Sequence, residues 1–349
     1  MRRGLISRSL AELPDAALDA RLERLRAAMA EARLDALLVY TNNSRAAGVS
    51  WLTGFVPYWS EALLVVPRAG EPVLVVALTY RVKSWIERTS RVADVIHTPR
   101  IGLEAAHMIG SAQADAAVGI ADLDGLSAGI VDDLREGGPR LTLSDASALF
   151  ARLRAEADPT EIALATKAAS IAQTALAQAH GAGLGDIIAA VEARARTLGA
   201  EEVYIAAAPD LARERRFKRI EGEASLGESF ALRATVAYKG VWVRLVRMCG
   251  SAALAGDEAD ARFAAAVAAL PREHGFAGFS SWLVEGCRIA QPLEPLMGSR
   301  VTDLNPPPPR ALVSVQACLE IDGRPVLLGA PALLGGRGEA AGLLVPPIL

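Results

Sequence analysis

The charged residues with the most informative spacing lie in residues 226–248, a stretch that predicts a β-hairpin. Apolar and polar residues alternate along both of its halves, and a Lys-Gly turn separates them. Arg233 lies on the first predicted strand, and Arg244 and Arg247 lie on the second. Guanidinium groups stay charged at working pH and bind carboxylates and phosphates through paired hydrogen bonds. The hairpin therefore predicts an arginine-lined pocket for a small anionic or zwitterionic molecule.

A basic loop at residues 213–219 precedes the hairpin and reads Arg-Glu-Arg-Arg-Phe-Lys-Arg. We expect its arginines, Arg216 among them, to reach the same pocket if the loop folds beside the hairpin. The alternative is a solvated loop together with a structural ion-pair cluster. In that alternative, Arg244 pairs with one of three later glutamates: Glu285, Glu294 and Glu320. The sequence leaves both interpretations open.

Catalysis in such a pocket would need a nucleophile or a proton-transfer group. Cys287 is one candidate, because Arg288 and Arg244 would lower its thiol pKa and favour the thiolate. A buried apolar cysteine is the alternative, since no histidine is close in the sequence to act as a base. Glu285 and Glu320 are the candidates for proton transfer, and each has an arginine as an equally suitable partner.

Two groups of elements must position these residues. In the first group, residues 15–31 predict an amphipathic helix, and the apolar run 34–40 predicts a buried strand. Predicted strands at 61–66 and 72–78, followed by further helix and strand alternation, complete an α/β domain that ends near Ser147.

The second group begins with a helix-start signal. Asp158 is the predicted N-cap, Pro159 occupies the first helical position and Glu161 the third. The later predicted elements are a helix, a strand, the hairpin, a helix and two final strands, at residues 184–198, 203–208, 226–248, 257–270, 311–321 and 326–334.

These segments resemble the pita-bread family of creatinases, prolidases, aminopeptidase P and methionine aminopeptidases. The likeness lies in Leu-Asp-Ala-Leu-Leu-Val from Leu34, in Leu-Thr-Gly-Phe ending at Phe55, in a Leu-Arg pair before the Glu-Ile helix, and in Leu-Gly-Glu before the hairpin. The resemblance implies an α/β creatinase/prolidase-like N-terminal domain at residues 1–148. An α+β pita-bread domain would follow at residues 149–349.

In that family five residues hold a pair of metal ions: two aspartates on the hairpin, a histidine, and two glutamates on the last strands. The resemblance assigns these positions to Arg233, Arg244, Cys287, Gln316 and Gly329. Two guanidiniums would repel a metal pair, so we expect neither a metal nor another cofactor, and Gln316 joins the predicted ligand-binding residues. A metal-free creatinase mechanism is not expected either, because the basic loop lacks a histidine and an amide cannot act as a base.

Composition limits the partners and the compartment. The formal net charge of -3 gives no case for nucleic acid or an anionic membrane, and no apolar run approaches the length of a membrane span. Three cysteines without CxxC spacing, and an N-terminus that does not read as a secretory leader, predict a cytoplasmic protein. The resemblance implies a homodimer, with the aromatic cluster of Trp51, Phe55, Tyr58 and Trp59 either at its interface or in the core.

Two functions from different classes remain. The first is a metal-independent hydrolase or lyase acting on a small anionic or zwitterionic C–N compound. The second is a non-catalytic pita-bread protein that binds a ligand or a partner protein. A cleft filled by Arg–Glu pairs and apolar side chains would favour the second.

Overall fold

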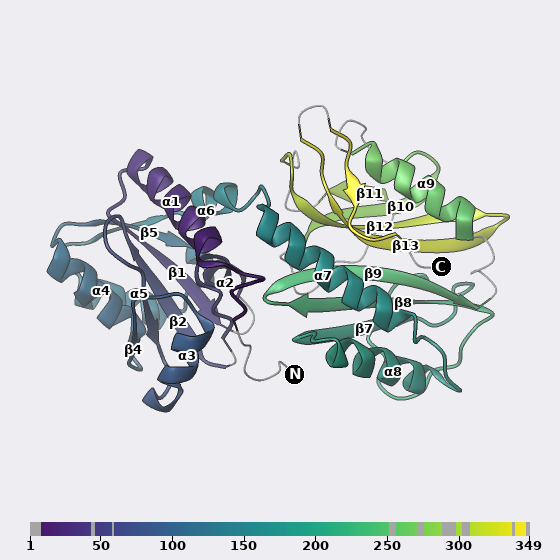
Figure 1. Cartoon of the computed structure of the whole chain (residues 1–349), viewed down its shortest axis with the longest axis horizontal. Coiled ribbons are helices and arrows are strands. Elements are labelled where there is room, and N and C mark those ends of the chain that lie inside the picture. The colour runs from purple at the N-terminus through teal and green to yellow at the C-terminus, as the bar shows by residue number, and fades with distance from the viewer. Residues whose placement is uncertain are drawn as a thin grey trace. The chain divides into compact units, whose positions relative to one another are not determined.

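The computed structural model of the chain describes residues 8–42, 46–57, 59–250, 256–270, 276–287, 298–301, 308–336 and 339–346. The chain divides into two compact units, residues 2–154 and residues 155–349. Figure 1 draws the first unit in purple to blue and the second in teal to yellow.

The first unit alternates helices and strands. Its elements in chain order are α1 (Asp15–Glu31), β1 (Ala36–Asn42), α2 (Ala47–Thr53), β2 (Glu61–Pro67), β3 (Val73–Val76), η1 (Tyr80–Val82), α3 (Lys83–Thr89), β4 (Asp94–His97), α4 (Ile101–Ala112), β5 (Ala117–Ala121), η2 (Leu123–Gly125), α5 (Ala128–Gly137), β6 (Thr142–Asp145) and α6 (Ser147–Leu153).

The strands of the first unit form one six-stranded sheet in the order β4-β3-β2-β1-β5-β6. The pairs β1–β2 and β2–β3 are antiparallel and the other three pairs are parallel. Both faces are apolar because helices cover both: α1, α2, α3 and α6 pack on one, and α4 and α5 on the other (Figure 1). The α/β class predicted for this part of the chain is confirmed.

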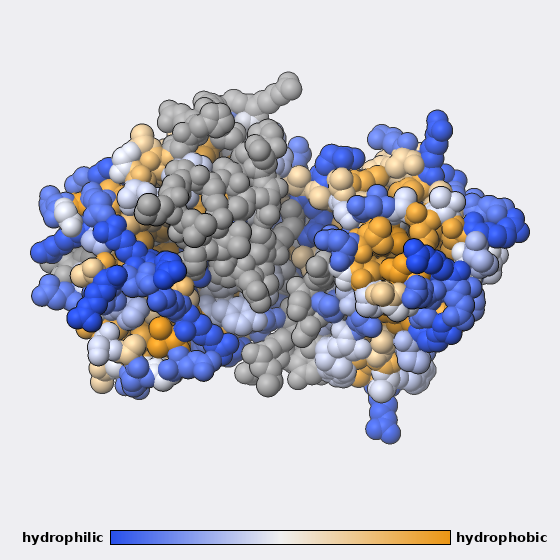
Figure 2. Space-filling view, turned by 180° about the vertical axis from the view of Figure 1, so that it is seen from behind, coloured by the Kyte–Doolittle hydropathy of each residue, from blue (hydrophilic) through white to orange (hydrophobic). Residues whose placement is uncertain are grey.

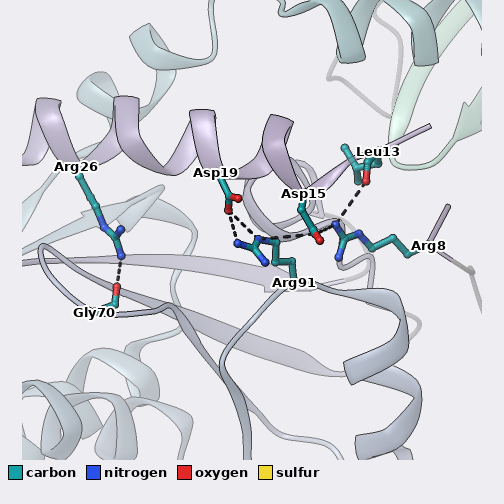
Figure 3. A network of polar contacts seen from close by, with 7 residues as sticks. All are labelled: Arg8, Leu13, Asp15, Asp19, Arg26, Gly70 and Arg91. Atoms are coloured by element: carbon teal, nitrogen blue, oxygen red, sulfur yellow. Dashed lines mark hydrogen bonds and ion pairs between the residues drawn. The ribbon is translucent and has the colours of Figure 1, made fainter. Parts of the chain in front are cut away.

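Helix α1 has the predicted bounds and is tied to its surroundings by charged residues along one side (Figure 3). Arg91 donates from Nε to Asp19 over 2.8 Å, and Asp15 pairs with Arg8. Arg26 donates to the carbonyl oxygen of Gly70. The pKa of Asp15 is lowered by its hydrogen bond to Arg8.

The aromatic residues that the sequence grouped together have different environments. Trp51 and Phe55 belong to the apolar core of the first unit. Trp59 is 43% exposed and stacks on Trp85 with the ring centroids 6.4 Å apart. Tyr58 lies outside the described residues.

The second unit contains two antiparallel hairpins with helices around them. Its elements in chain order are α7 (Pro159–Leu176), α8 (Leu184–Thr197), β7 (Glu202–Ala208), β8 (Ser229–Tyr238), β9 (Val241–Gly250), α9 (Gly256–Ala268), β10 (Phe279–Gly286), β11 (Gly298–Val301), β12 (Leu312–Ile321), β13 (Arg324–Leu333) and β14 (Gly342–Leu343).

These strands form two sheets, a three-stranded one in the order β7-β8-β9 and a five-stranded one in the order β11-β10-β12-β13-β14. Helices α7 and α8 cover one face of the smaller sheet through Leu232 and Leu245. Its other face contributes Val246 and Met248 to a core shared with α9 and the larger sheet. The α+β class predicted for this part is also confirmed.

The helix start and the hairpin turn that the sequence predicted are both present in the second unit. Asp158 and Glu161 make a reciprocal capping box at the start of α7, with Pro159 at the first helical position. Strands β8 and β9 pair up to Tyr238 and Val241, and the turn residues Lys239 and Gly240 both have positive φ. Strand β10 was not anticipated from the sequence.

The described surface carries both hydrophilic and hydrophobic residues (Figure 2). Figure 2, which views the chain from behind, shows hydrophilic residues over much of the described surface with hydrophobic residues between them. No helix within the described ranges is long and apolar enough to cross a membrane.

Candidate functional site

The hairpin β8–β9 places two arginines on one face of the smaller sheet. Arg233 lies opposite Val246, and Thr235 lies opposite Arg244. Because alternate residues of a strand point to the same side, Arg233, Thr235, Arg244 and Val246 share this face. The spacing of eleven residues across a two-residue turn therefore brings both guanidiniums to the same side of the sheet.

The strands β12 and β13 supply the opposing surface. Gln316 lies directly opposite Gly329 in their register. Gly329 lies against Val246 of the hairpin, where an added Cβ would be only 2.6 Å from Cγ2 of that valine. A side chain at position 329 would therefore force Val246 to shift. The structure brings together the hairpin positions and the two final-strand positions that the resemblance assigned.

Arg244 forms an ion pair with Glu285 of β10, in the centre of the second unit. The Nη1 and Oε1 atoms are 3.2 Å apart, and both side chains are 0% exposed. Burial lowers the pKa of Arg244, Glu285 and Cys287 oppose that shift, and Arg233 adds to it. Arg233 and Cys287 are thus among the groups that influence the pKa of Arg244.

Arg233 has a different set of contacts. Its Nη1 donates a hydrogen bond of 2.9 Å to Oε1 of Gln316, which joins the hairpin to β12. Its guanidinium carbon also lies 4.8 Å from the ring centroid of Phe217, a distance typical of a cation–π contact. Both side chains of the hydrogen bond are buried, with Arg233 4% and Gln316 2% exposed.

Cys287 follows directly after β10 and is 2% exposed. Its backbone N–H donates to the carbonyl oxygen of Leu312. The other two cysteines, Cys249 and Cys318, are also buried free thiols, and burial raises the pKa of both. A raised thiol pKa disfavours the thiolate, so these two are packing residues.

Three predicted site residues lie away from the buried cluster. Arg247 is on the opposite face of the hairpin and donates to the carbonyl oxygen of Leu176 in α7. Arg216 is at the surface, where its side chain is 63% exposed and pairs with Glu214. Glu320 is the third, and its half-exposed carboxylate pairs with Arg215.

The sequence contained signals for residues that were not singled out. Phe217 is the only apolar residue in the basic loop at residues 213–219. An apolar residue among charged ones is expected to be buried, and the ring of Phe217 contacts the guanidinium of Arg233. Glu201 accepts hydrogen bonds from the backbone N–H groups of Lys239 and Gly240 and so fixes the hairpin turn. Ser314 lies opposite Glu285 and is completely buried.

The cluster does not fit the metal pair that the resemblance implies. Metal ions of this kind need carboxylate oxygens and imidazole nitrogens, whereas Arg233 and Arg244 bring positive charge to the same place. Among the described residues, no group of three or more His, Cys, Asp and Glu could hold a metal ion. Glu294 and Arg288, which the sequence also suggested, lie outside the described residues.

Comparison with known proteins agrees with the resemblance described for the N-terminal domain and with the observed fold. Residues 21–155 match the model of the creatinase/prolidase N-terminal domain family. No curated protein sequence matches the chain.

Solved structures match over almost the whole chain. The X-Pro aminopeptidase from Thermotoga maritima has a TM-score of 0.70 at 14% identity, covering 94% of this chain and 99% of that one. The Xaa-Pro dipeptidase from Bacillus anthracis has a TM-score of 0.66 at 15% identity, covering 95% and 99%. The prolidase from Pyrococcus furiosus has a TM-score of 0.64 at 16% identity, covering 93% and 98%.

The resemblance predicted from the sequence is thus confirmed for the N-terminal domain and for the fold. Residues 21–155 match the creatinase/prolidase N-terminal domain, and the chain as a whole has the pita-bread fold of the solved X-Pro aminopeptidase and prolidase structures.

Proposed function

We propose that this chain is a non-catalytic, metal-independent pita-bread protein that acts by binding a ligand or a partner protein. The observation that carries the proposal is the Arg244–Glu285 ion pair, in which both side chains are fully enclosed. It lies between the hairpin and the last strands, where the resemblance puts a metal pair. The second arginine, Arg233, is engaged with Gln316 and Phe217.

The positions of the three candidate catalytic residues support the proposal. A catalytic acid, base or nucleophile must contact the substrate. Glu285 is enclosed and held by Arg244, and Cys287 is buried. Glu320 is accessible but lies four residues along β12 from Gln316 and is held by Arg215. The three residues therefore do not share one accessible surface.

A second candidate function is the metal-independent hydrolase or lyase acting on a small anionic or zwitterionic C–N compound. Ser314 Oγ and Gln316 Nε2 favour it, because both atoms are buried without a hydrogen-bond partner within the described residues. A buried polar atom of this kind usually marks a place for a water molecule or a ligand. Two such donors beside Arg233 and Arg244 suit a small carboxylate or phosphate.

One experiment separates the two candidates. The purified protein is assayed against Xaa-Pro dipeptides and creatine with and without Mn²⁺, Co²⁺ or Zn²⁺, and its thermal unfolding is followed with the same metals and with acetate and phosphate. We expect no turnover and no rise in Tm with metal, because ligands raise Tm only by binding the folded state. Turnover that is lost in a folded Cys287→Ala or Gln316→Leu variant would refute the non-catalytic proposal. An anion-induced rise in Tm that is lost in Gln316→Leu would establish the arginine pocket as a ligand site.

We also propose the homodimer and the cytoplasmic location that the sequence analysis predicts. Light scattering should give twice the chain mass of 36.6 kDa, and a monomer at micromolar concentration would refute the homodimer. Cell fractionation tests the location.

A further inference from the structure

The first unit contains a hollow between α1 and α6. Its volume is about 450 Å³, which falls within the range of small-molecule sites. Its lining is formed by the end of α1 with the residue after it and by one side of α6, through Ala28, Glu31, Ala32, Leu149, Arg152 and Leu153.

The floor of this hollow is apolar. Ala28 lies in the last turns of α1 and Ala32, four residues later, is the residue that follows the helix in a right-handed helical conformation, while Leu149 and Leu153 are four residues apart on α6. Each pair therefore lies on one side of its helix. The small alanine side chains leave the space that the two leucines border. An aliphatic group placed there would be removed from water by four apolar side chains.

The walls carry opposite charges, Glu31 from α1 and Arg152 from α6. Neither side chain has an ion pair or hydrogen bond within the described part of the chain. The other side of α1 contrasts with this, since its charged residues Asp15, Asp19 and Arg26 all have partners (Figure 3).

The position of Glu31 adds a second argument. It is the last residue of α1, and the last turn of that helix contains no basic residue. A carboxylate at a helix C-terminus is repelled by the helix dipole, so fold stability does not explain this glutamate. A cation seated beside Glu31 would be attracted by both the carboxylate and the terminal carbonyl groups.

We propose that this hollow is a binding site for a free α-amino acid with an aliphatic side chain. Its ammonium group lies against Glu31, its carboxylate accepts paired hydrogen bonds from Arg152, and its side chain covers the alanines and leucines. Opposite charges on the two walls select a zwitterion over a simple anion or cation. The site is independent of the buried Arg244–Glu285 pair and of the function proposed for that region.

The test is calorimetric titration of the full chain with L-leucine, 4-methylpentanoate and leucinamide. The last two ligands each lack one of the two charges. We expect leucine to bind and each analogue to bind at least tenfold more weakly, because a charge-assisted hydrogen bond is worth about a factor of ten or more. Arg152→Gln and Glu31→Gln should each weaken leucine binding by a similar factor, and Ala32→Leu should block it by filling the floor.

Matched controls remove charges of the same type elsewhere on the first unit. Glu23→Gln on α1 and Arg88→Gln on α3 are exposed and do not line the hollow, so they should bind leucine as the wild type does. In the double exchange Glu31→Arg with Arg152→Glu, binding should recover relative to either single exchange, because both charges are again present. No heat of binding with millimolar leucine, isoleucine or valine would overturn the proposal. Equal binding of leucine by wild type and Arg152→Gln would overturn it too, as would an Arg152→Gln variant that changes only the oligomeric state.

Discussion

Removal of one partner of the Arg244–Glu285 ion pair should destabilise the second unit strongly. At 3.2 Å and an effective dielectric constant of about 20, two unit charges attract each other by about 5 kcal/mol. Burial of each charge costs several kcal/mol, so the intact pair contributes little net stability. A single substitution, however, leaves the remaining charge buried without this partner. We therefore expect Arg244→Met to lower the free energy of unfolding by about 3–5 kcal/mol.

The assay is urea and thermal unfolding, followed by circular dichroism and tryptophan fluorescence. For a unit of this size 1 kcal/mol corresponds to about 2–4 °C in Tm, so Arg244→Met should lower Tm by about 6–20 °C. Glu285→Leu should have a similar effect. The double variant should regain most of the loss, because apolar replacement of both charges removes the desolvation cost as well. The control is Arg216→Met, which removes an exposed, paired guanidinium and should change stability by no more than about 0.5 kcal/mol.

Two results would refute this reasoning. One is an Arg244→Met variant within about 1 kcal/mol of the wild type, which would mean that the pair is solvated. The other is a double variant whose loss equals the sum of the two single losses, which would mean that the two charges are not coupled.

Three further predictions follow from the structure. Gly329→Ala should destabilise the protein by about 1–3 kcal/mol through its clash with Val246, and denaturant unfolding should show a smaller cost in a Val246→Ala background. Asp158→Ala should cost about 1 kcal/mol through loss of the capping box, and a change below about 0.3 kcal/mol in the same assay would contradict it. Arg216 and Lys218 together lower the pKa of Glu214 to about 2 from its usual value of 4.5, with the hydrogen bond from Arg216 as the largest cause. Stability from this carboxylate is therefore complete above pH 4.5 and lost as the pH falls toward 2, and Arg216→Met should flatten that part of a plot of Tm against pH.

Much of the fold could be predicted because it depends on short-range signals. The capping box at Asp158 needs only residues three positions apart, and α1 follows from the periodicity of its leucines. The two-residue turn at Lys239 sets the register of β8 and β9, and that register with a strand period of two places Arg233 and Arg244 on one face. Arg247 is three residues after Arg244 on β9, and an odd spacing along a strand puts two side chains on opposite faces. The sequence therefore already indicated that Arg247 lies on the other face from Arg244.

The sequence by itself determined which side chains stand at the hairpin positions and that two fixed positive charges share one face. It could not determine their partners, because Glu285 and Gln316 are brought to the hairpin only by the packing of a second sheet. From the sequence, any of three glutamates could have paired with Arg244. In the folded protein the partner is Glu285, whose side chain is 0% exposed. Glu320 is instead half-exposed and pairs with Arg215. Burial decides the character of such a pair, because a charge removed from water must be matched at short range. Burial is a property of the assembled sheets and not of any one stretch of residues.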